Sequence, residues 1–172
     1  IFFMEKLITL SINDLAKITN HRSGEIKFGE KILTIPKDTD PIDFIKSSEA
    51  KFVLFGIPED IGVRANYGRP GAASAWESAI KSIANIQHNR FSKGNHIIAL
   101  GQLNVKQEME EVKHLDFNDI DDRSKLSQLV EKIDKEVSHI ICKIIQCGKI
   151  PIVIGGGHNN AYGNIKGAAL AK

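Results

Sequence analysis

Short apolar runs alternate with longer amphipathic stretches over the last two thirds of the chain. Three of the runs are rich in β-branched residues and continuously apolar, as are strands buried on both faces of a parallel sheet. These runs cover residues 51–56, 95–101 and 149–154. The sequence therefore predicts one strand in each of them.

Helical periodicity fills the intervals between these runs. Over residues 72–86, apolar side chains return every three or four positions, which places them on one face of a helix. The strongest pattern spans residues 124–147, where one face is apolar, the other carries Lys and Glu, and Gly148 suits the end of the helix. A further helix is expected from Asn159 onward.

Strands that alternate with helices are typical of a parallel sheet with right-handed crossovers. We therefore expect a three-layer α/β/α fold over residues 51–172. Residues 1–50 are mixed in period, and we interpret them as an N-terminal extension with a short helix near residues 12–19. The polar, acidic stretch 104–122 is most simply an exposed connection.

Composition narrows the class of protein. The chain has 172 residues, of which 42% are hydrophobic, enough for one domain with a real core. The net charge is only +2 and the basic residues are scattered, which argues against nucleic acid or an anionic membrane as a partner. Because no apolar run is long enough to span a membrane and no export signal is evident, we expect a cytoplasmic protein.

The two cysteines, Cys142 and Cys147, fall late in the longest predicted helix. Their spacing is neither a Cys-x-x-Cys redox pair nor a zinc knuckle. We interpret them as small apolar side chains near the helix end rather than as redox groups.

Neither end of the chain carries a clear terminal signal. It begins Ile1-Phe2-Phe3-Met4, without an initiating methionine, and its last six residues, which end at Lys172, continue a helical pattern with no stop signal. We therefore expect either that residues 1–3 are foreign to the natural protein or that the sequence is part of a longer one.

Candidate chemistry lies in two loops that follow predicted strands. The first loop covers residues 56–71, and the second reads Gly155-Gly156-Gly157-His158-Asn159-Asn160. In an open α/β sheet, the carboxyl ends of the strands are where ligands bind. Glycines let the backbone turn there without side-chain clashes, and His158 is a candidate metal ligand. One imidazole does not complete a metal site, because three or more protein ligands are needed.

Three motifs in and beside these loops resemble a known family. Gly-Ile-Pro stands at 56–58, Arg-Pro-Gly-Ala at 69–72 and Gly-Gly-Gly-His at 155–158. In this order and spacing, they resemble the ureohydrolases, which comprise arginase, agmatinase and formimidoylglutamase. The resemblance covers about two thirds of the chain, and it implies an arginase-like α/β/α fold of which residues 51–172 are the N-terminal half.

The resemblance also implies an activity. Ureohydrolases hold two Mn²⁺ ions that ionise a bridging water for attack on a guanidino or formimidoyl carbon, chemistry suited to a paired metal site. His158 matches the family's first metal ligand. The family's other ligands come from an Asp-x-His-x-Asp segment and an Asp-x-Asp segment downstream of the Gly-Gly-Gly-His motif, and neither segment occurs between His158 and Lys172. We therefore expect the catalytic residues to lie beyond Lys172, which leaves an incomplete active site and an inactive fragment.

The substrate and assembly follow from the same resemblance. Residues 159–163 read Asn-Asn-Ala-Tyr-Gly, closer to formimidoylglutamase-like proteins than to arginases or agmatinases. A small guanidino or formimidoyl amino-acid-derived substrate is implied, with homo-oligomers when the protein is full-length.

Each candidate residue also has a purely structural interpretation. In the structural interpretation, His158 only caps the following helix. Arg69 has two interpretations of equal weight: it binds a substrate carboxylate by paired hydrogen bonds, or it ties down its own loop. Asn159 and Asn160 would orient ligands or substrate from behind the site, or only shape a turn. For Asn66 we favour local turn geometry.

Two acidic residues after the first strand, Glu59 and Asp60, sit where a metal ligand or a general acid or base would lie. The family pattern gives them no ligand role. We therefore expect them to be solvated loop residues.

Two other classes of function remain open. One is a non-catalytic structural or interaction module with an arginase-like fold. The other is an anion or nucleotide-phosphate site at Gly155–Gly157, where free N–H groups and a helix dipole favour negative charge. Against the phosphate site, neither a Gly-x-Gly-x-x-Gly nor a Gly-x4-Gly-Lys-Ser/Thr string is present. Bound Mn²⁺ would distinguish the hydrolase from both.

Overall fold

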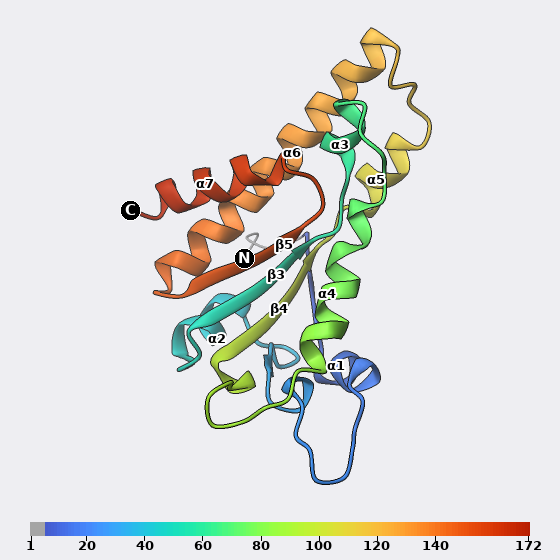
Figure 1. Ribbon diagram of the computed structural model, residues 1–172. Helices are drawn as coiled ribbons and strands as arrows, with labels where there is room; N and C mark the ends of the chain where they lie inside the picture. Colours follow the sequence, from blue (N-terminus) through green and yellow to red (C-terminus); the bar gives the residue numbers. More distant parts are fainter. Residues whose placement is uncertain (1–5) are drawn as a thin grey trace.

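A five-stranded mixed sheet runs through the computed structural model, which describes residues 6–172 (Figure 1). The expectation about residues 1–3 lies outside the described residues. The strands are β1 (Leu7–Thr9), β2 (Leu33–Thr34), β3 (Phe52–Ile57), β4 (Ile97–Leu103) and β5 (Ile150–Gly155). The three strands predicted from apolar runs are thus confirmed, within two residues at each end.

The sheet order is β1-β4-β3-β5, and β2 also pairs with β4. β3 lies parallel to β4 on one side and to β5 on the other, which confirms the predicted parallel core. β1 differs, since it pairs with β4 in the antiparallel direction.

Seven α-helices are described, together with short 3₁₀ turns. They are α1 (Ile12–Ile18), α2 (Pro41–Ser47), α3 (Ile61–Ala65), α4 (Ala75–Ala84), α5 (Lys106–Val112), α6 (Ile120–Gln146) and α7 (Asn160–Leu170). α6 begins four residues before the predicted start, because the Asp119 side chain accepts hydrogen bonds from the amides of Asp121 and Asp122. α1, α4 and α7 fall where helices were predicted.

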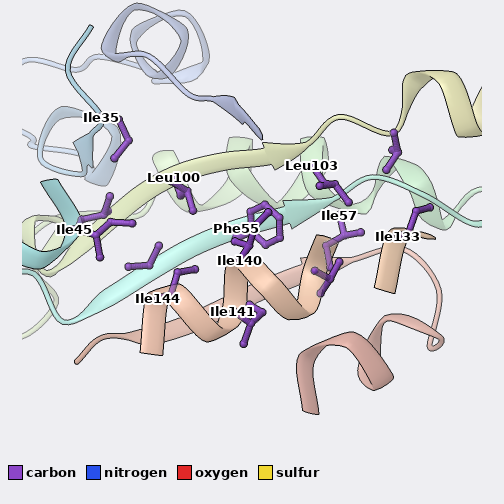
Figure 2. Close-up of a cluster of buried hydrophobic side chains, with 14 of the residues drawn as sticks. Ile35, Ile45, Phe55, Ile57, Leu100, Leu103, Ile133, Ile140, Ile141 and Ile144 are labelled. Carbon is purple, nitrogen blue, oxygen red and sulfur yellow. The ribbon is translucent and has the colours of Figure 1, made fainter. Parts of the chain in front are cut away.

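One face of the sheet packs against α6, with α2 at its edge and α7 lying along α6 (Figure 1). Because side chains of a strand alternate between faces, Val53, Phe55 and Ile57 of β3 all point to this side. Figure 2 shows Phe55 and Ile57 on the side of the sheet that faces α6, together with Ile140 and Ile144 of that helix. This cluster is the larger of the two cores.

The opposite face carries the second core, built from α1, α4 and the segment between α1 and β2. Leu54 and Ala99 point to this side, and Trp76 of α4 covers the strand. A Cβ on Gly56 would lie 2.2 Å from the Trp76 ring, so glycine lets the indole lie directly on β3. Helices on both faces confirm the three-layer α/β/α fold.

The segment before residue 51 contributes to the same sheet. β1 and β2 both pair with β4, and Leu15, Phe28 and Ile32 enter the second core. The segment therefore packs on the sheet, while a domain boundary at residue 50 stays a prediction.

The prediction of an exposed connection over residues 104–122 is wrong. The stretch contains α5, with Val112 buried and Met109 packed on the larger core. Glu108 is also buried, and its carboxylate is paired with Lys6 and Lys132. A helix of seven residues shows only about two turns of periodicity, which its many charged side chains conceal.

Within residues 6–172, no helix combines the length and apolar character needed to cross a membrane.

Candidate functional site

The two candidate loops leave the sheet side by side. Ile57, the last residue of β3, is in register with Gly155, the last residue of β5, and the Gly156 amide donates to the Ile57 carbonyl at 3.0 Å. Both loops therefore lie at the carboxyl edge of a parallel sheet, where the sequence placed the site.

The triple glycine is explained by close packing rather than by a left-handed backbone. Positive φ is found in the described chain at four glycines, and none of them is in this loop. A Cβ on Gly156 would lie 1.4 Å from the carbonyl oxygen of Glu59, and one on Gly157 would lie 2.1 Å from Asn159 Oδ1. Gly155 is less confined, with its nearest neighbour 3.1 Å away.

His158 is exposed at the start of the turn into α7. Its carbonyl accepts the Ala161 amide at 3.0 Å, but in the described part of the chain its imidazole makes no hydrogen bond or ion pair. The side chain of Asn159, the N-cap residue of α7, makes no capping hydrogen bond among the described residues either. The imidazole is thus free to bind a ligand, and the helix-capping interpretation is not supported.

Glu59 is fully buried, so the expectation that it is solvated is wrong. Its Oε1 accepts from Asn160 Nδ2 at 2.6 Å and from Asn159 Nδ2 at 3.1 Å, and its Oε2 accepts the Ile61 amide at 2.7 Å. Glu59 follows directly after β3 and Pro58, where the chain turns inward against the glycine loop. The carboxylate therefore joins the two loops.

Asp60 is also buried, with 1% of its surface exposed, which corrects the second part of that expectation. Its Oδ1 accepts from Arg64 Nε and its Oδ2 from the Gly71 amide, at 2.7 and 2.6 Å. Burial alone would raise the pKa of Asp60, but the hydrogen bonds from Arg64 and Gly71 outweigh it and hold the pKa below its usual value. Asp60 thus ties the beginning of its loop to the end.

Arg64, which the sequence interpretation did not single out, ties down this loop. Arg69 is exposed, and its side chain has no hydrogen bond or ion pair within residues 6–172. Asn66 ends α3 through backbone hydrogen bonds, as its local interpretation implies. An acidic residue followed four positions later by an arginine was the signal available in the sequence for the Asp60–Arg64 pair.

A hollow of about 260 Å³ opens beside His158 and the three glycines. Asn160 and Asn164 of α7 also line it, and the Oδ1 atoms of both are buried without a hydrogen-bond partner among the described residues. A hollow with unused acceptors can take a ligand that donates hydrogen bonds. A larger hollow, of about 520 Å³, lies between α5 and α6 and contains none of the candidate residues.

Asp134 of α6 lies behind the loops and is mostly buried. Burial raises its pKa, and the negative charge of Glu59 adds to the effect, while the Gly163 amide opposes it. The two carboxylates therefore repel one another.

The described residues do not form a complete metal site. Within residues 6–172, no group of three or more His, Cys, Asp or Glu side chains is placed to hold a metal ion. His158 supplies one exposed imidazole, so further ligands would have to come from residues other than these. The expectation that the catalytic residues lie beyond Lys172 concerns none of the described side chains and stays a prediction.

Comparison with known proteins defines the class. Residues 50–172 match the arginase family, and the chain belongs to that family. The match begins where β3 is about to start and includes both loops of the site.

Formimidoylglutamases are among its relatives. That of Hahella chejuensis is 30% identical over 122 residues, and that of Geobacillus sp. is 33% identical over 124. These alignments cover 71% and 72% of this chain, but 30% and 32% of the relatives. The formimidoylglutamase of Clostridium tetani is 33% identical over 121 residues, covering 67% of this chain and 28% of the relative. The chain thus spans less than a third of the length of these relatives. No solved structure matches it.

Proposed function

We propose that the protein carrying this sequence is a manganese-dependent hydrolase of a linear C–N bond in a formimidoyl or guanidino compound. The observation that carries the proposal is the exposed His158 at the carboxyl end of β5, in a chain of the arginase family. The named activity of its relatives favours formimidoylglutamate over arginine or agmatine as the substrate.

Within this proposal, His158 is one metal ligand. A pair of manganese ions, when bound, supplies a strong nucleophile from water at neutral pH and directs its attack on a poorly electrophilic carbon. The remaining ligands and the catalytic residues are proposed to follow Lys172 in the whole protein, and the 172-residue chain alone is proposed to be inactive.

The chain's other residues would bind and orient the substrate. The guanidinium of Arg69 is exposed and has no hydrogen bond or ion pair among the described residues, which suits it to paired hydrogen bonds with a substrate carboxylate. Asn160 lines the hollow beside His158, and its buried carbonyl oxygen has no hydrogen-bond partner among the described residues, so it could accept from an N–H group of an amidine. A cytoplasmic location and a homo-oligomer complete the proposal.

The glycine loop is poorly suited to the alternative of a phosphate site. The amides of Gly156, Ala161 and Tyr162 already donate to carbonyls of Ile57, His158 and Asn159, at 3.0 Å each. Fewer N–H groups then remain for an anion than the sequence implied.

The test is hydrolysis of formimidoylglutamate, agmatine and arginine by the whole protein, with manganese quantified on the same sample. We expect close to two Mn²⁺ per active site and the highest kcat/KM for formimidoylglutamate. A metal-free protein that hydrolyses none of the three would overturn the proposal and favour the non-catalytic module.

A further inference from the structure

We propose that Glu59 is the positioning residue for the loop that carries His158. The role of His158 in this inference rests on the proposed function, but the effect of Glu59 on the loop does not. Glu59 is not a ligand here: it acts through Asn159 and Asn160, the two residues that follow the histidine.

The contacts make Glu59 the bridge between the two loops. Its carboxylate accepts from one backbone amide of its own loop, that of Ile61, and from both side-chain amides of the other. The backbone of the same residue also touches the second loop, because the Glu59 carbonyl occupies the space that a Cβ of Gly156 would fill. The backbone and the side chain of Glu59 together fix the glycine loop in a single position relative to β3.

A carboxylate in this place determines which way both asparagines face. Ionised Glu59 can only accept hydrogen bonds, so each asparagine must turn its Nδ2 toward it and its Oδ1 away. Asn159 Oδ1 then points between Gly62 and Gly157, where a Cβ on either glycine would lie within 2.3 Å of it. Asn160 Oδ1 is directed away from Glu59, on the residue that lines the hollow beside His158.

The surroundings of the Glu59 carboxylate differ from those of the other buried glutamate, Glu108. Among the described residues, Glu59 has no ion pair, whereas the buried Glu108 is paired with both Lys6 and Lys132. A buried carboxylate without a cation depends on its hydrogen bonds for stabilisation, so their loss has a large effect. The nearby carboxylate of Asp134 repels that of Glu59 and does not stabilise it.

Glutamine cannot replace this carboxylate without losing contacts, although it has the same shape. The Ile61 amide needs an acceptor at Oε2, and both asparagine amides need one at Oε1. A glutamine has one oxygen, so its NH₂ must face a donor at one of these places. Changing Asn160 to Asp in the same chain restores an acceptor for that NH₂, and returns one negative charge to the cluster.

The experiment compares Glu59→Gln, the double variant Glu59→Gln with Asn160→Asp, and Glu108→Gln in the whole protein. Glu108→Gln is the matched control, since it also neutralises a buried glutamate but lies on α5, away from the glycine loop. Hydrogen exchange of residues 155–162, without metal, reports the loop, and titration with Mn²⁺ alone reports the presentation of His158.

In Glu59→Gln we expect loop exchange at least about tenfold faster and Mn²⁺ affinity about 10- to 100-fold weaker. We expect kcat to fall more than KM rises. The double variant should recover loop protection, and Glu108→Gln should lower thermal stability while leaving both loop protection and Mn²⁺ affinity unchanged.

Three outcomes would overturn the inference: wild-type loop exchange in Glu59→Gln, no recovery in the double variant, or the same loop effect in Glu108→Gln. The proposed function fails separately. If His158→Ala keeps wild-type Mn²⁺ affinity while Glu59→Gln still loosens the loop, then Glu59 positions the loop and His158 is not a ligand.

Discussion

The loops after β3 and β5 begin in register at the same edge of the sheet, yet they are stabilised in different ways. The β3 loop is closed by its own residues: Asp60 pairs with Arg64 four positions on and with the Gly71 amide eleven positions on. The β5 loop has no ion pair within residues 6–172. It is stabilised by glycine packing and by Glu59, a hundred residues earlier in the chain.

The two loops therefore differ in how far each depends on the other for its shape. The β3 loop can keep its shape through local contacts, whereas the β5 loop takes its shape from the β3 loop. The candidate ligand His158 therefore stands on the dependent loop, and changes in either loop affect it.

The largest effect is expected for His158→Ala. Loss of a ligand should lower kcat/KM of the whole protein at least about 100-fold, because even residues behind the ligands commonly change it by 10- to 100-fold. Steady-state kinetics and manganese content measure it. His96→Ala, an exposed histidine before β4, is the control and should behave as wild type. Wild-type turnover and wild-type manganese content in His158→Ala would show that His158 is not a metal ligand.

Gly156→Ala should break the contact between the loops. Its Cβ would overlap the Glu59 carbonyl, and a main-chain atom cannot move aside as a side chain can. Overpacking of this kind costs about 1–3 kcal/mol of unfolding free energy, measurable by urea denaturation. Gly155→Ala is the matched comparison, with its closest contact at 3.1 Å, and should cost clearly less. Equal stability of the two variants would show that the loop yields easily.

Asp60→Asn should loosen the β3 loop by itself. Removing the charge from a buried, hydrogen-bonded pair should lower the unfolding free energy by about 2 kcal/mol at pH 7. Because the folded pKa of Asp60 lies below its usual value of 3.8, the stabilising contribution is present above pH 3.8 and is lost as the pH falls through the folded pKa. Denaturation curves of both proteins should therefore converge in acid. A difference that is independent of pH would contradict this account.

Arg69→Ala tests whether Arg69 binds substrate while Arg64 stabilises the loop. Since the Arg69 side chain makes no hydrogen bond or ion pair within residues 6–172, the variant should raise KM about tenfold with little change in melting temperature. Arg64→Ala should do the reverse and lower the melting temperature first. An unchanged KM in Arg69→Ala would show that Arg69 does not bind the substrate.

The smallest effect, and the only stabilising one, is expected for Asp134→Asn. Burial and the charge of Glu59 raise the pKa of Asp134, so its ionised form is unfavourable in the folded protein at pH 7. The variant should melt a few degrees higher at pH 7. The gain should shrink as the pH falls through the raised folded pKa toward 3.8 and the wild-type carboxyl becomes protonated. A lower melting temperature at pH 7 would contradict this.

Local patterns were sufficient to predict most of the fold. Continuous apolar runs predicted β3, β4 and β5, and the apolar face over residues 124–147 predicted α6. These signals are strong because they repeat over several residues. α5 was missed since its buried face consists of only a few residues, and one of them, Glu108, is charged and becomes buried through lysines far away in the sequence.

The candidate site was only partly predictable, for a different reason. His158, Asn159 and Asn160 could be placed at a strand end from their motif, and the structure puts them there. The burial of Glu59 depends on the approach of the β5 loop, which no pattern near residue 59 encodes. An acidic residue in a loop is usually solvated, and here only tertiary contact with two asparagines reverses that expectation.

The bridge from Glu59 to Asn160 also has a consequence for the order of folding. It joins residues separated by 101 positions, so a large loop must close before the contact can form. α6 can form early from its own sequence, but the glycine loop can adopt its native shape only after β5 has paired with β3. The surroundings of His158 should thus be among the last parts of this chain to become ordered during refolding.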